Sequence, residues 1–161
     1  MKLLVLLSMV AMLSACGQRP DNTPQLLARI DSLQHTLDHA YKPGLGEFMS
    51  DIQVHHAKLW FAGAAQNWKL ADFEIGEIKE ALDNAKEYCS DRPEIKSLPM
   101  IQPAMDSMTN AVQQQNPQLF MNGFVLLTNT CNNCHHAVNH EFNVIKIPDT
   151  PPFSNQDFKP R

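Results

Sequence analysis

The chain has 161 residues, of which 43% are apolar, 19% charged and 7% aromatic. This length and composition predict one globular domain with its own core, and they exclude a collagen-like chain, a disordered chain and a disulfide-stapled miniature protein. The formal net charge of −4 leaves no excess of basic residues to neutralise phosphates, so we do not expect nucleic acid as a partner.

The first fifteen residues predict a cleaved export signal. Lys2 precedes a mainly apolar run over 3–13, and small residues follow immediately before Cys16. The apolar run is too short to span a bilayer as a stable helix. Residues 1–15 are therefore expected to be a signal peptide that is absent from the mature protein.

The end of this signal, Leu13-Ser14-Ala15-Cys16, resembles the lipobox of bacterial lipoproteins. The resemblance implies cleavage before Cys16, diacylglycerol on its sulfur and an acyl chain on its amine, which together anchor a protein stably to a membrane. An ordinary cleaved signal followed by an unrelated cysteine is the alternative. Gly17 stands where an aspartate would signal retention in the inner membrane, so the outer membrane, facing the periplasm, is favoured.

Apolar residues recur at helical spacing through most of the remaining chain. Residues 17–24 are expected to form a flexible linker, followed by a helical domain over 25–161. An amphipathic stripe runs over 26–40 and ends before Pro43-Gly44. Further helices are predicted over roughly 47–67 and 70–88, from Pro103, and from Pro117 after an Asn cap.

The predicted fold is all-α. The four helices from residue 47 onward are joined by short links, which favours an antiparallel four-helix bundle. The helix at 26–40 is an extra N-terminal element, either packed as a fifth helix or acting as a stalk toward the membrane. The proline-rich tail from Pro148 is expected to be extended and held to the domain by Phe153 and Phe158.

The sequence Cys131-Asn132-Asn133-Cys134-His135 is the pattern of covalent c-type haem attachment. Two thiols three residues apart reach the two vinyl groups of one porphyrin, and the adjacent histidine serves as the proximal iron ligand. A thioredoxin-like redox pair would need a βαβ setting, and half of a zinc site would need a second ligand pair; the sequence offers neither. We therefore predict one covalent haem c on Cys131 and Cys134, with His135 on the iron.

The motif lies on the last predicted helix, and in this position it resembles the class II cytochromes c, the four-helix bundles of the cytochrome c′ type. The resemblance covers roughly residues 43–140, and only the haem motif within it is specific. The segment over 45–68 is also similar to small c-haem proteins of proteobacteria, which brings no established activity with it. The helix at 26–40 and the tail after His140 depart from the class II pattern.

The class II resemblance implies that the sixth iron site is presented by the N-terminal half of the first bundle helix. Met49 and His56 lie seven residues apart on the inward stripe of that helix. A methionine ligand would raise the reduction potential and suit electron transfer, whereas a histidine would lower it. The alternatives are a core methionine, a buried histidine that hydrogen-bonds a propionate, and an open five-coordinate iron. The resemblance favours Met49.

The other histidines are expected to lie on the surface. His35 and His39 lie on the polar face of the 26–40 helix. His55 is about 100° around its helix from the inward stripe, and is therefore expected to be exposed. His136 and His140 follow the proximal ligand and are expected to line the surface near the haem edge.

Four further residues carry structural expectations. Cys89 is expected to be a small buried hydrophobic residue, with an intermolecular disulfide as the alternative. Trp60 and Trp68 are expected to pack in the core or against the haem. Gly63 lies on the inward stripe and would permit the close approach of a ring or of another helix.

These features predict a membrane-tethered periplasmic electron carrier rather than an enzyme. Redox proteins are the expected partners, an accessory role in a larger oxidoreductase is a further option, and the sequence leaves a homodimer open. A haem protein that binds NO or CO at an open iron, for sensing or scavenging, is the alternative function. No carboxylate pair, nucleophile triad or phosphate loop supports hydrolase or transferase chemistry.

Overall fold

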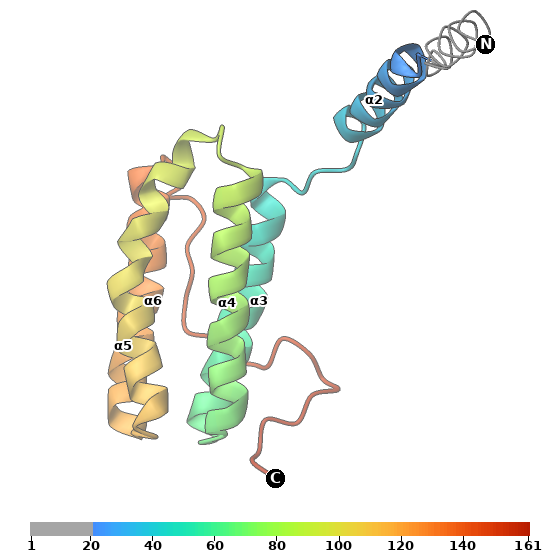
Figure 1. Cartoon of the computed structure of the whole chain (residues 1–161). Coiled ribbons are helices and arrows are strands. Elements are labelled where there is room, and N and C mark those ends of the chain that lie inside the picture. Colours follow the sequence, from blue (N-terminus) through green and yellow to red (C-terminus); the bar gives the residue numbers. More distant parts are fainter. Residues whose placement is uncertain (1–20) are drawn as a thin grey trace, which may run out of the picture. The chain divides into compact units, whose positions relative to one another are not determined.

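The computed structural model of the chain describes residues 21–161 (Figure 1). The predicted signal peptide at 1–15 and the predicted lipidated Cys16 lie outside this range. The chain divides into two compact units, Met1–Tyr41 and Lys42–Arg161. The predicted domain over 25–161 is therefore divided near residue 41. No helix within 21–161 combines the length and the apolar character needed to cross a membrane.

The described part of the N-terminal unit contains one helix, α2 (Thr23–Asp38). Pro24 lies in its first turn, where a missing N–H costs no helical hydrogen bond. The last two residues of the predicted 17–24 linker therefore belong to this helix. Within its own unit α2 buries no residue, since a single helix cannot cover its own apolar stripe.

The C-terminal unit consists of helices and connecting segments. Its elements are α3 (Leu45–Ala64), α4 (Trp68–Tyr88), the 3-10 helix η1 (Pro93–Ile101), α5 (Gln102–Gln113) and α6 (Pro117–Ala137). The described residues form no strand, so the all-α prediction is confirmed. The sequence did not predict η1, because Pro93 and Pro99 interrupt the spacing that marks an α-helix.

Two asparagines begin the helices after the tight turns. The Asn67 side chain accepts a hydrogen bond from a backbone N–H in the first turn of α4, and Asn116 accepts two in the first turn of α6. The residues just before them, Gln66 and Gln115, adopt φ values of 58° and 51°. This left-handed conformation turns the chain between one helix and the next.

The core of this unit is shared by α3, α4, α5 and α6, which lie side by side in Figure 1. Its largest fully buried side chains include Leu59, Ile75, Met108, Phe120 and Phe124. The rings of Trp60 and Trp68 pack around the two phenylalanines, with centroid distances of 4.9 to 6.5 Å. The core-packing prediction for both tryptophans is confirmed.

Gly63 brings α3 and α6 close together. A Cβ atom built at this position would lie 2.0 to 2.3 Å from three carbons of the Phe120 ring. Only glycine leaves room for that ring, so the predicted close approach of a ring is confirmed.

The tail after α6 contacts the helices through both predicted phenylalanines. Phe158 is buried, and its ring centroid lies 5.6 Å from that of Phe61. Phe153 is 45% exposed and lies beneath the Lys58 ammonium group of α3, which is 5.5 Å from its centroid. Phe158 therefore holds the tail to the core, and Phe153 holds it by a cation–π contact at the surface.

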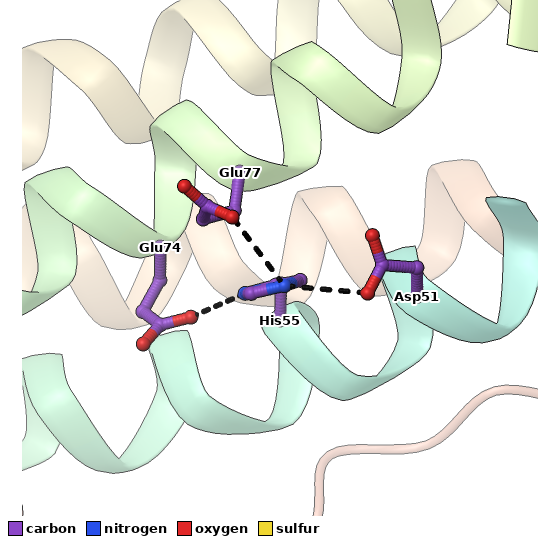
Figure 2. A network of polar contacts seen from close by, with 4 residues as sticks. All are labelled: Asp51, His55, Glu74 and Glu77. Carbon is purple, nitrogen blue, oxygen red and sulfur yellow. Dashed lines mark hydrogen bonds and ion pairs between the residues drawn. The ribbon is translucent and has the colours of Figure 1, made fainter. Parts of the chain in front are cut away.

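His55 is the clearest error in the sequence-based prediction, because it is buried rather than exposed. Its Nδ1 lies 2.6 Å from Oε2 of Glu74 on α4, and its Nε2 lies 3.4 Å from Asp51 and 3.8 Å from Glu77 (Figure 2). Glu74 is fully buried, and its Oε1 has no hydrogen-bond partner. Helix α3 packs against α4 as well as α6, so it buries two faces, and one inward stripe does not describe it.

Candidate functional site

One cavity of about 490 Å³ in the C-terminal unit collects the predicted haem-site residues. Met49 and His56 line it from α3, and Cys131, Cys134 and His135 line it from α6. Much of the remaining wall is apolar and comes from Leu45, Ile52, Leu82, Leu98, Ile101 and Val138. All five predicted haem-site residues therefore share one cavity, although Met49 and Cys131 are far apart in the sequence.

The two thiols reach this cavity because three-residue spacing keeps side chains on one side of a helix. Neither Cys131 nor Cys134 forms a disulfide. Burial raises the pKa of Cys131 to about 11 and also raises the pKa of Cys134 above its ordinary value. Both are therefore protonated thiols at neutral pH, unlike the low-pKa thiolates of dithiol oxidoreductases.

The imidazole of His135 is oriented by a backbone carbonyl. Its Nδ1 lies 2.6 Å from the carbonyl oxygen of Asn143, in the segment after α6. A carbonyl oxygen only accepts hydrogen bonds, so Nδ1 carries the proton in this contact and the neutral ring leaves Nε2 as a free lone pair. Metal-binding histidines are commonly held in this way.

The segment that supplies this carbonyl is fastened to the haem motif itself. The Asn132 side-chain amide donates to the Ile145 carbonyl, and its oxygen accepts from the Ile145 N–H, both at 2.8 Å. The chain turns back toward α6 at Asn139, which has a φ of 60°. The sequence analysis assigned Asn132 no role, and the spacing of the motif gives no sign of this contact.

On the other helix of the site, His56 is held by Thr128. Its Nε2 lies 3.0 Å from the Thr128 hydroxyl oxygen, and that hydroxyl donates to the Phe124 carbonyl. The hydroxyl oxygen therefore accepts a hydrogen bond from the Nε2–H of His56. Burial lowers the pKa of His56 to about 4, so the ring is neutral at physiological pH. Met49, one of the two predicted ligand candidates, is half-buried on the same helix.

A charged pair lies at the cavity wall. The Arg92 guanidinium donates to both carboxylate oxygens of Glu94, at 2.7 and 3.3 Å. This hydrogen bonding holds the pKa of Glu94 at about 2. The sequence analysis missed both residues, because Arg92 lies in the turn before η1 and Glu94 in the first turn of η1, where no α-helical spacing marks a side chain as facing a site.

The predicted surface position is confirmed for His35, His39 and His136 but not for His140. His35 and His39 are exposed, and their rings stack at 4.1 Å. His140 is half-buried and lines the cavity, whereas His136 is exposed and lies outside the lining. Cys89 is buried, as predicted, and its thiol lies 3.7 Å from the Pro43 carbonyl.

The donor groups of the cavity are not arranged for a bare metal ion. Within residues 21–161, no three His, Cys, Asp or Glu side chains come together in a manner that would hold one.

The chain matches no protein-family model, no curated protein and no solved structure. The residues of the cavity therefore carry the functional assignment on their own.

Proposed function

We propose that this protein is a monohaem c-type cytochrome that carries single electrons. One observation carries the proposal: Cys131, Cys134 and His135 line a single cavity together with Met49 and His56. A cavity of about 490 Å³ has room for a group much larger than an ion.

The chemistry of the cavity suits a haem. The two thiols can form thioether bonds to a porphyrin. His135 can bind the iron through Nε2, because its Nδ1 donates a hydrogen bond to the Asn143 carbonyl. A volume of about 490 Å³ and largely apolar walls are typical of sites for cofactors. When bound, the haem supplies the one-electron redox chemistry, and the protein supplies ligands, burial and orientation.

For the sixth ligand we propose Met49. The Nε2 atom of His56 is already engaged with Thr128, and iron ligation through that atom would break this hydrogen bond. Met49→Ala should therefore convert a low-spin haem to high spin and lower its potential, because loss of a thioether ligand disfavours the ferrous state. His56→Ala should leave the haem low-spin.

Absorption and electron paramagnetic resonance spectra of the two variants decide between three outcomes. High spin in Met49→Ala alone supports the electron carrier. High spin in His56→Ala alone assigns a lower-potential bis-histidine haem. High spin in the wild type, with rapid CO binding, supports the gas-binding alternative instead.

The finer architecture and the cellular site belong to the same proposal. We propose that α3, α4, α5 and α6 form an antiparallel four-helix bundle of the class II type. The short capped turns at Gln66 and Gln115 support this, because they link successive helices with few residues.

We propose that the protein is periplasmic and anchored by lipid on Cys16, with the outer membrane favoured.

Covalent attachment is tested by acid–acetone extraction. The wild type and Cys89→Ala should keep their haem, since Cys89 is buried outside the cavity lining. A variant with both Cys131→Ala and Cys134→Ala should lose it. Complete loss of haem from the wild type would reject the proposal.

A further inference from the structure

We infer that Asn132 is a positioning residue for His135, acting through the backbone segment that follows α6. The inference rests on the proposed haem function, since it concerns the histidine proposed to bind iron. Asn132, which lies between the two cysteines, would then control how strongly His135 donates its electron pair to the iron.

Two linked sets of contacts carry the inference. Asn132 holds the backbone of Ile145 by two hydrogen bonds of 2.8 Å, one donated and one accepted. Two residues earlier, the Asn143 carbonyl lies 2.6 Å from His135 Nδ1. The chain between them is too short to move independently, so fixing Ile145 also fixes the Asn143 carbonyl.

The residue type matters, because an amide side chain presents a donor and an acceptor side by side, as a peptide group does. Alanine would remove both hydrogen bonds, and aspartate would keep only the acceptor. Asn133, the neighbouring residue in the motif, is exposed, so it offers a control of the same chemical type.

The expected consequence is electronic as well as structural. A hydrogen bond from Nδ1 to a carbonyl makes the other ring nitrogen a stronger donor, which favours ferric iron and lowers the reduction potential. If Asn132 maintains that bond, its removal should raise the potential. A residue that only fastened the tail would leave the potential unchanged.

The test compares Asn132→Ala with Asn133→Ala in the haem-loaded protein. Redox titration should show a higher potential only for Asn132→Ala. In a Met49→Ala background, where the haem is expected to be high-spin, resonance Raman spectra of the ferrous form should show a weakened iron–histidine stretch for Asn132→Ala. Amide hydrogen exchange at Ile145 should be faster in the same variant. Unchanged potential and stretch, with faster exchange at Ile145, would overturn the inference and leave Asn132 a purely structural role.

A second pair of variants keeps the test decisive if Asn132→Ala does not accumulate. Asn132→Leu and Asn133→Leu nearly keep the size of the side chain and add no charge, so the difference between their potentials reports the loss of the two hydrogen bonds to Ile145. Asn132→Leu should have the higher potential of the two, and equal potentials would overturn the inference. A wild type that holds no haem would reject the proposed function instead, which is a separate outcome.

A second proposal comes from an independent observation, the apolar stripe of α2. We propose that this stripe pairs with α2 of a second copy in a parallel, two-stranded coiled coil. Leu26, Ile30, Leu33 and Leu37 follow the alternating steps of four and three residues that define a heptad repeat. These side chains are 57% to 64% exposed, so the stripe has no cover within the described part of its unit.

The heptad positions favour two parallel strands. Leu26 and Leu33 occupy d positions, and Ile30 occupies the a position between them, which is the combination found in parallel dimers. A helix of 16 residues is also marginal when isolated in water, so a partner would stabilise it.

The charges on α2 and its place in the chain select a second copy over a lipid surface. Interfacial helices carry a face rich in Lys and Arg, whereas α2 has Arg29 as its basic group against Asp31 and Asp38. Its first residue, Thr23, follows the proposed anchor at Cys16 by seven residues in the sequence. Two anchored chains would therefore begin their helices at the same height and in the same direction, at a high effective concentration.

Disulfide cross-linking in isolated membranes tests this pairing. Leu33→Cys should give an oxidised dimer, whereas Asp31→Cys, at an outward b position, should not. Leu26→Cys should behave as Leu33→Cys does, and mixed Leu26→Cys and Leu37→Cys chains should form no cross-linked pair between the two positions. Equal cross-linking at 31 and 33, or none at 26 and 33, would overturn the proposal. Recovery of the wild type in the soluble fraction would show that the anchor, a separate claim, is wrong.

Discussion

His56 shows how burial and one hydrogen bond prepare a side chain at the proposed haem site. The residue is 4% exposed, donates from Nε2 to Thr128, and packs with its ring tilted by 36° against Phe124 at a centroid distance of 4.4 Å. Its pKa is lowered to about 4 because the charged form would lose its hydration. The residue is therefore held neutral and in one orientation.

This lowered pKa predicts a pH dependence of stability. The unfolded chain binds a proton at His56 near pH 6.5, while the folded protein does so only near pH 4. The contribution of His56 to the free energy of unfolding is therefore fully present above pH 6.5. It falls by about 3 kcal/mol as the pH is lowered toward 4. Urea unfolding at several pH values should show this loss in the wild type. A His56→Gln variant with the same slope between pH 6.5 and 4 would contradict the assignment.

Gly63 gives a second prediction at the scale of one residue. Gly63→Ala should destabilise the fold by about 3 kcal/mol or more, because the new methyl group would overlap the Phe120 ring. Gly76→Ala is the matched control: it lies within α4 with no atom near its built Cβ, and it should stabilise by about 0.5 to 1 kcal/mol. Denaturant unfolding measures both, and equal effects would be inconsistent with the close contact.

At the scale of elements, the buried pair of His55 and Glu74 joins α3 to α4. Glu74→Ala should cost about 3 kcal/mol, because it leaves a buried imidazole without its closest partner. Asp51→Ala should cost less than about 1 kcal/mol, since the Asp51 side chain is 59% exposed and 3.4 Å away. Thermal unfolding compares the two, and similar losses would argue against a specific role for the buried pair.

Much of the helical pattern could be predicted from spacing alone, because each long helix buries a stripe of apolar residues. That Cys131, Cys134 and His135 share one cavity was also predictable, because their spacing keeps them close together on one helix; their binding of haem stays a prediction. His55 could not be predicted from one stripe, because a helix with two neighbours buries a second face. Asn132 and Arg92 act through an irregular segment and a turn, whose paths depend on the folded chain rather than on periodicity.

At the scale of the whole molecule, the chain divides into an N-terminal unit that includes α2 and a C-terminal helical unit that contains the proposed haem site. The proposed anchor predicts that Cys16→Ser abolishes acylation, because the thioether and the new amino terminus that carry the lipids depend on that cysteine. Labelling with radioactive palmitate and membrane fractionation should mark the wild type and not the variant. An unlabelled wild type would show that the N-terminal segment is not a lipoprotein signal.

The central claim is that Cys131 and Cys134 hold one haem covalently, and denaturing mass spectrometry tests it most directly. The mature protein should retain the mass of one haem after unfolding, and fragmentation should locate that mass in the peptide that contains residues 131–135. A peptide of unmodified mass, with two free thiols or a disulfide between the cysteines, would contradict the account.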